Sequence, residues 1–201
     1  MKAEVTQLAI LRAAEVLFAE HGVDLVSLRE VAAAAKQRNH SAVLYHFGDK
    51  RELLEALLHR HSGPIDAGFP GALAEIEAAR PVTIEAICKL LVRPLAAKLD
   101  DVDGGPAYLQ VCAELTVSRS FPLTSFRAAT GPGATAVTAR LHGLMKDQQP
   151  ALVPLRMLRV AGLLFGSLAA YHRMTSDGFD VPRDLFEQDL VLSLRALLTS
   201  A

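Results

Sequence analysis

The segment Ser27–Lys50, with the sequence SLREVAAAAKQRNHSAVLYHFGDK, decides how the N-terminal part of this chain folds. Its first half is rich in alanine, and Ser27 with Glu30 forms the S-x-x-E pattern of a helix capping box. The polar stretch Lys36–Asn39 interrupts the helical pattern, and a second short helix is expected to end near Tyr45. The segment therefore predicts two short helices joined by a tight polar turn.

Helical patterns flank this segment on both sides. Before it, apolar residues recur at helical spacing from Val5 to Phe18, and Gly22 is expected to end that helix. After it, Gly48 is a stop signal and Asp49 is expected to cap a further helix that carries several leucines on one face. The N-terminal region is thus predicted to be a small module of three or four short helices.

The second short helix lies in a stretch without acidic side chains. No acid occurs between Glu30 and Asp49, although the chain as a whole has a net charge of −1. In a helix-turn-helix, the second helix enters the major groove, and hydroxyls and cationic side chains around it bind phosphates. The pattern is compatible with DNA binding and equally with a solvated turn between two helices. The candidate DNA-binding residues are Ser27, Lys36, Gln37, Arg38, Asn39, His40, Ser41, Tyr45, His46 and Lys50.

The composition of the 201 residues is that of a globular helical protein. Hydrophobic residues make up 51% and charged residues 21%, which provides a substantial core. Cys88 and Cys112 lie in apolar runs and are expected in that core. We find no nucleophile–base pair, paired carboxylates or phosphate loop, and we predict no enzyme, cofactor or metal site. The acidic run Asp100–Asp103 lacks the downstream glutamate of a calcium loop and is interpreted as a solvated helix end.

The rest of the chain is predicted to be a larger helical bundle. Glycine and proline in Ser62–Gly71 indicate a break, which suggests a module at 1–62 and a second domain at 63–201. The longest apolar run, Val160–Tyr171, is shorter than the roughly 20 residues needed to span a bilayer, so we expect a cytoplasmic protein without membrane contact. The fold class is all-α, with helices expected near 72–79, 82–99, 106–118, 131–147, 151–175 and 184–199.

Residues 4–58 resemble the DNA-binding domain of the TetR/AcrR family of transcriptional regulators. The resemblance rests on three motifs: Ile10-Leu11-x-Ala13-Ala14-x-x-Leu17-Phe18-Ala19-Glu20-His21-Gly22, Ser27-x-x-Glu30-Val31-Ala32 and Tyr45-His46-Phe47-Gly48-Asp49-Lys50-x-x-Leu53. The usual Ala-Gly of the family turn is Ala35-Lys36 here. The resemblance implies phosphate contacts from Ser27, Tyr45, His46 and Lys50, base reading by 38–43, and a module core of Leu17, Phe18, Val31, Val43 and Phe47.

The resemblance also implies partners for the remaining chain. Residues from about 70 onward would bind a small-molecule effector and form a homodimer, with the helices at about 151–175 and 184–199 as the interface. A dimer would suit an operator of two-fold symmetry in double-stranded DNA. The scarcity of polar residues suggests an apolar or amphipathic effector. Its candidate pocket is Leu91, Leu95, Tyr108, Cys112, Phe121, Phe126, His142 and Phe165.

The predicted function is a ligand-responsive transcriptional regulator, most simply a repressor that releases its operator when the effector binds. One alternative is a helical-bundle protein that binds small molecules or protein partners and has lost DNA binding. The missing turn glycine is the feature that favours this alternative.

Overall fold

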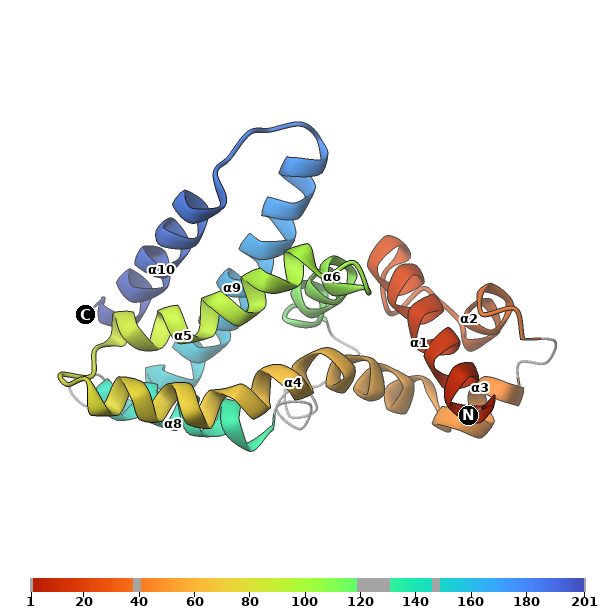
Figure 1. Ribbon diagram of the computed structural model, residues 1–201, viewed down its shortest axis with the longest axis horizontal. Helices are drawn as coiled ribbons and strands as arrows, with labels where there is room; N and C mark the ends of the chain where they lie inside the picture. Colours follow the sequence, from red (N-terminus) through yellow and green to blue (C-terminus); the bar gives the residue numbers. More distant parts are fainter. Residues whose placement is uncertain (1, 38–40, 119–130, 146–148, 201) are drawn as a thin grey trace.

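The computed structural model describes residues 2–37, 41–118, 131–145 and 149–200, and all regular structure in these ranges is helical (Figure 1). The all-α fold class is thereby confirmed. The helices are α1 (Lys2–His21), α2 (Leu28–Ala34), α3 (Ser41–Phe47), α4 (Lys50–Ala78), α5 (Ile84–Ala96), α6 (Gly105–Leu115), α8 (Pro132–Leu144), α9 (Val153–Ser176) and α10 (Arg183–Thr199), with 3-10 turns η1 (Ala97–Asp100) and η2 (Pro150–Leu152).

Local signals place the helix ends of the N-terminal module where the sequence predicts them. Gly22 follows α1 with a φ of 86°, a left-handed conformation that glycine adopts without steric cost. Ser27 and Glu30 form both hydrogen bonds of the capping box at the start of α2. Asp49 accepts a hydrogen bond from the Glu52 amide at 2.8 Å and caps α4.

The predicted break at Ser62–Gly71 is wrong, because α4 runs through it without interruption. Pro64 and Pro70 both lie inside this helix. A proline within a helix costs about 3 kcal/mol, so packing has to offset the local penalty. Phe69 is buried on the inner face of α4, and Asp66 accepts hydrogen bonds from the first amides of α8. The domain boundary at residue 62 stays a prediction, and α4 crosses it as one continuous helix.

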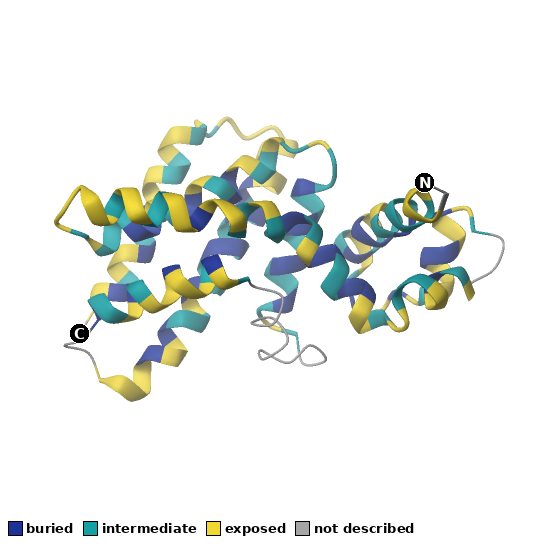
Figure 2. Ribbon diagram, turned by 60° about the horizontal axis from the view of Figure 1, so that its bottom comes forward, coloured by how far each residue is buried: buried dark blue, intermediate teal, exposed yellow. Residues whose placement is uncertain are grey.

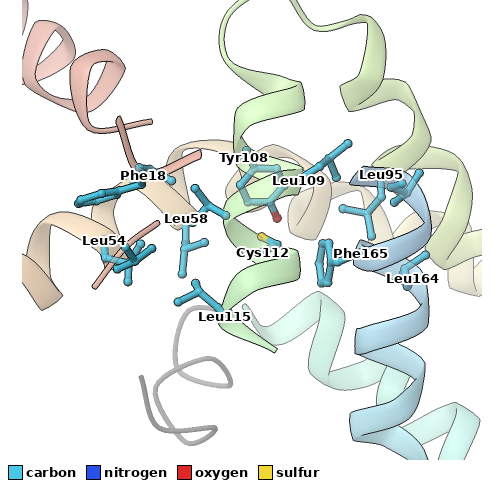
Figure 3. Packing of buried hydrophobic residues seen from close by; sticks show 14 of the residues in the cluster. Phe18, Leu54, Leu58, Leu95, Tyr108, Leu109, Cys112, Leu115, Leu164 and Phe165 are labelled. Atoms are coloured by element: carbon cyan, nitrogen blue, oxygen red, sulfur yellow. The ribbon is translucent and has the colours of Figure 1, made fainter. Parts of the chain in front are cut away.

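One hydrophobic core runs from the N-terminal module into the bundle. Phe18 of α1 and Leu54 and Leu58 of α4 lie at one side of this core, and side chains of α6 continue it toward α9 (Figure 3). Phe18, Val31 and Val43 are buried, whereas Leu17 and Phe47 are partly buried and pack against the same cluster. The module core inferred from the resemblance is therefore present.

The bundle places α6 and α9 side by side, α5 against α10, and α4 against α8 (Figure 1). Buried residues face inward from each helix, and exposed residues cover the outside (Figure 2).

Cys88 and Cys112 are both buried, and burial raises the pKa of the Cys88 thiol to about 11. They are core residues, as the sequence predicts.

The segment Pro150–Ser176 is long and apolar enough to cross a membrane by length and composition alone. It exceeds the apolar run that the sequence pattern isolates, because η2 and α9 extend that run at both ends. In the structure α9 packs on α6 and α10, yet only 33% of its apolar window is buried within the chain. This helix therefore has both a core face and an uncovered apolar face.

Candidate nucleic-acid interface

Ser27 stands at the start of α2, where the backbone amides point outward. Its side-chain oxygen accepts a hydrogen bond from the Glu30 amide at 3.2 Å, and its own amide donates to Glu30 Oε2 at 2.7 Å. The Ser27 hydroxyl, and after it the Ser27 amide, donates to Glu30 Oε2 and holds the pKa of Glu30 below its ordinary value. The capping box thus gives the Ser27 and Glu30 amides at the start of α2 hydrogen-bond partners within the module. A phosphate contact by Ser27 stays a prediction and would have to share a hydroxyl that also donates to Glu30.

Lys36 forms the turn after α2 with a φ of 55°, and it is the sole non-glycine residue with positive φ in the described ranges. The left-handed region costs a side chain about 1–2 kcal/mol. The turn nevertheless closes, because the Lys36 amide donates to Ala33 O and the Gln37 amide to Ala32 O. Gln37 also donates from its side chain to Ala35 O at 2.9 Å. The missing glycine therefore leaves the turn conformation intact.

The helix α3 presents a polar and aromatic face outward. Val43 is fully buried and fixes the helix on the module core, while Ser41 and Leu44 are exposed. The Tyr45 side chain is 85% exposed and meets the half-buried His46 ring edge-on, with 5.1 Å between centroids. An exposed tyrosine suits a phosphate contact. The predicted base-reading residues Arg38, Asn39 and His40 lie outside the described residues.

Lys50 has a partner inside the module. Its ammonium donates to the Asp24 carbonyl at 3.2 Å and lies 5.9 Å from the centroid of the Phe18 ring. This position ties the loop between α1 and α2 to the start of α4. An ammonium has three hydrogens, so one bond to Asp24 leaves others for a phosphate.

The structure brings part of the predicted effector pocket together. Leu95 of α5, Tyr108 and Cys112 of α6 and Phe165 of α9 are buried near one another (Figure 3), and the Tyr108 and Phe165 rings meet edge-on at 6.5 Å. Burial raises the pKa of Tyr108 well above its ordinary value. Leu91 is half-buried on α5, whereas His142 is exposed on α8 and so does not join this buried group. Phe121 and Phe126 lie outside the described residues.

A buried ionic cluster that the sequence does not predict lies beside these residues. Glu15 of α1 is 1% exposed, and its Oε1 lies 2.5 Å from Arg60 Nη1 and 2.8 Å from His61 Nε2. His61 is 2% exposed and stacks on the Tyr108 ring, with 4.8 Å between the ring centroids. The available signal was Glu15 itself, an acid on the apolar face of α1 between Leu11 and Phe18.

The acidic run before α6 is also bound up in ion pairs. Asp103 accepts hydrogen bonds from Arg12 Nε at 2.8 Å and pairs with Arg60, and the hydrogen bond from Arg12 is the largest cause that lowers its pKa to about 2. Asp101 pairs with Lys98, and Asp100 with Arg183. Each of these carboxylates therefore pairs with a lysine or arginine of the protein itself. Among the described residues no His, Cys, Asp and Glu group is arranged to hold a metal ion.

The fold and the N-terminal site define a helix-turn-helix module carried on a helical bundle. Residues 10–57 match the family described as "Bacterial regulatory proteins, tetR family". Over 50 residues the chain is 50% identical to the HTH-type transcriptional repressor Rv3405c of Mycobacterium tuberculosis and to the HTH-type transcriptional regulator Mb3439c of Mycobacterium bovis. Each match spans 25% of this chain and 26% of the relative, about a quarter of its length.

Solved structures extend the likeness to the whole fold. A candidate tetR-family transcription regulator from Shewanella sp. PV-4 has a TM-score of 0.62 and 16% identity over 96% of this chain and 95% of that one. The fatty acid degradation regulator FadR from Bacillus halodurans has a TM-score of 0.56 and 17% identity over 96% and 95%. The N-terminal module of this chain is thus similar to that of TetR-family regulators, and the chain as a whole shares the fold of their solved structures.

Proposed function

We propose that this protein is a transcriptional repressor that binds an operator in double-stranded DNA and releases it when a small apolar or amphipathic effector enters the bundle. The observation that carries DNA binding is the intact turn at Lys36, followed by α3 with Tyr45 exposed. Such a role also places the protein in the cytoplasm.

DNA binding is tested by gel-shift titration with genomic fragments that flank the protein's own gene, at several salt concentrations. Specific binding that weakens with salt supports the proposal, because phosphate contacts release counterions. Binding to no fragment, or equal binding to all, contradicts it and favours a small-molecule or protein-binding bundle. Lys50→Ala should weaken binding to all sequences and lower the salt slope by about one unit at most, whereas Arg38→Ala should change sequence preference.

The dimer is proposed to form through α9 and α10. The apolar side chains Leu155 and Met174 of α9 and Leu185 and Leu192 of α10 are exposed, and Leu185 is 58% exposed. A Cβ added to Gly166 of α9 would meet open space, so that helix surface is uncovered. Exposed apolar patches of this kind are typical of subunit interfaces. A two-fold dimer presents two modules to two half-sites, as a palindromic operator requires.

Sedimentation equilibrium tests the interface. The wild-type protein is expected at the mass of two 21.6 kDa chains, and Leu155→Asp/Leu192→Asp is expected as a monomer. The matched control is Leu25→Asp, a highly exposed leucine of the loop between α1 and α2, which should stay dimeric. A monomeric wild type, or a dimer unaffected by the α9 and α10 changes, contradicts the assignment.

The effector is proposed to bind beside Tyr108, Cys112 and Phe165, with Leu91 and Leu95 of α5. Apart from the half-buried Leu91, these side chains are buried together between α5, α6 and α9, so the effector would enter by displacing part of this core packing. A panel of apolar and amphipathic compounds can be screened by thermal shift, since a ligand at 100 times its Kd stabilises the folded state by about 2.7 kcal/mol. A hit should weaken operator binding, and Phe165→Ala should reduce its effect. A compound that binds here and leaves operator affinity unchanged contradicts the release step, because release requires unequal affinity for the two states.

A further inference from the structure

The helix α6 contacts the N-terminal module near both of its ends. Before its first turn, the Asp103 carboxylate pairs with Arg12 of α1 at 2.8 Å. In its last turn, Glu114 Oε1 accepts a hydrogen bond from the Val23 amide at 2.8 Å, and Val23 belongs to the loop that leads into α2. In Figure 1, α6 lies between α1 and the other bundle helices.

The first contact is reinforced by close packing. Gly104 has a φ of 91°, and a Cβ at this position would collide with the Glu15 carboxylate. The loop before α6 therefore approaches α1 as closely as a glycine allows. Arg60 bridges Glu15 and Asp103, so α1, α4 and this loop share one set of charges. One turn further along α6, the Tyr108 ring stacks on His61.

Two contacts at opposite ends of α6 fix the orientation of the N-terminal module on the bundle as well as its position. Asp103 and Glu114 are eleven positions apart, which corresponds to about 16 Å along a helix. The module cannot rotate about the Arg12–Asp103 contact without breaking the bond between Glu114 and Val23. The Arg60 ion pairs and the stacking of Tyr108 on His61 support the same orientation.

We propose that the Arg12–Asp103 and Glu114–Val23 contacts set the spacing between operator half-sites that this protein reads. The inference rests on the proposed function, in which two modules of a dimer bind two half-sites. Half-site spacing follows from the distance between the recognition helices of a dimer. That distance depends on how each module is held on its bundle, so residues that touch no DNA determine this part of the specificity.

The test uses the full-length protein and the operator found by gel shift, in versions whose central spacer is lengthened or shortened by single base pairs. Wild-type protein is expected to favour one spacing by about tenfold or more, the size of an ordinary coupling between sites. In Arg12→Ala/Glu114→Ala this preference should shrink to within about threefold, with weaker binding to the best spacing. Neither Arg12 nor Glu114 is fully buried, so the double variant should fold, which a thermal unfolding curve verifies.

Arg140→Ala is the matched control, because it removes an ion pair with Glu77 between α8 and α4, away from the module contacts. It should keep the wild-type spacing preference. A folded Arg12→Ala/Glu114→Ala protein with that same preference overturns the inference. Wild-type protein that binds no operator at any spacing overturns the proposed function instead.

A second measurement tests the inference without DNA. A spin label at Arg29→Cys, on the exposed side of α2, reports the distance between the two modules of a dimer, and the native cysteines are buried and escape labelling. The distance distribution should be narrow in the otherwise wild-type protein and should broaden in the double variant. Equal widths contradict the inference, whereas a monomeric protein contradicts the proposed dimer.

Discussion

Glu15 Oε1 lies 2.8 Å from His61 Nε2, with both side chains almost completely buried between α1 and α4. Arg60 joins the same carboxylate at 2.5 Å and extends the cluster to Asp103. Buried charges are stable only when they are paired and hydrogen-bonded. The N-terminal module and the bundle therefore share a polar junction whose members depend on one another.

Glu15→Ala is expected to lower the free energy of unfolding by about 3–5 kcal/mol, the usual cost of removing one partner of a buried ion pair. The reason is that Arg60 and His61 would lose their shared acceptor while staying buried. Urea unfolding at neutral pH measures the effect. Glu55→Ala removes the i,i+4 pair with Arg51 at 3.1 Å on the surface of α4 and should cost less than about 0.5 kcal/mol. Equal losses for the two variants would contradict a structural role for the cluster.

Glu114 should make stability fall as pH rises above the ordinary pKa of a glutamate, 4.5. Burial raises the pKa of this carboxyl above its ordinary value of 4.5. With the folded pKa raised, the stability that Glu114 provides is complete below the unfolded value and is lost as pH rises through the folded value. Glu114→Gln keeps an oxygen to accept from the Val23 amide and cannot ionise. The unfolding free energy of this variant relative to wild type should therefore rise as pH increases above the ordinary value of 4.5.

A comparison with Glu114→Ala separates charge from hydrogen bonding. The alanine variant leaves the Val23 amide without its acceptor, so it should be less stable than Glu114→Gln at every pH. Chemical unfolding at a series of pH values gives all three curves. A wild-type–glutamine difference that does not change with pH would show that the raised pKa has no effect on stability.

The sequence predicts the helix-turn-helix well because its signals are local. The capping box of Ser27 and Glu30 and the cap of Asp49 each join residues three positions apart, and their geometry follows from the helix itself. The same local reasoning fails for α4. Pro64 and Pro70 indicate a break when read alone, and packing against α8 and the core overrides them.

The junction between module and bundle could not be predicted in the same way. Glu15 and His61 are 46 positions apart, and Val23 and Glu114 are 91 positions apart. Neither pair leaves a periodic pattern, because each partner sits in an ordinary helix or loop. The apolar neighbours of Glu15 show that its charge must be paired, but only the fold identifies Arg60 and His61 as the partners.

Lys36 should be replaceable by glycine with a gain in stability. Its φ of 55° is strained for a side chain and free for glycine. Lys36→Ala removes the charge and keeps the strain, so the glycine–alanine difference isolates the backbone. Lys36→Gly should be more stable than Lys36→Ala by about 1 kcal/mol, measured by thermal or urea unfolding. If alanine is the more stable, the turn is not left-handed in solution.

Both variants should bind DNA more weakly than wild type if Lys36 contacts a phosphate, and by similar factors.

Asp103 should lose its contribution to stability in acid. Hydrogen bonds from Arg12 and then Arg60 lower its pKa to about 2 from an ordinary value of 3.8. Because the folded pKa is depressed, the stabilisation is present above the unfolded value and is lost as pH falls through about 2. Asp103→Asn cannot form the ion pairs at any pH, so the gap in unfolding free energy between wild type and this variant should be constant at neutral pH and close on the acid side of about pH 4. In an Arg12→Ala background the gap should be smaller throughout, because one of the two guanidinium partners is gone. A gap that stays open in acid, or that is unaffected by Arg12→Ala, would mean that the Asp103 side chain supports the loop before α6 by its shape and not by its charge.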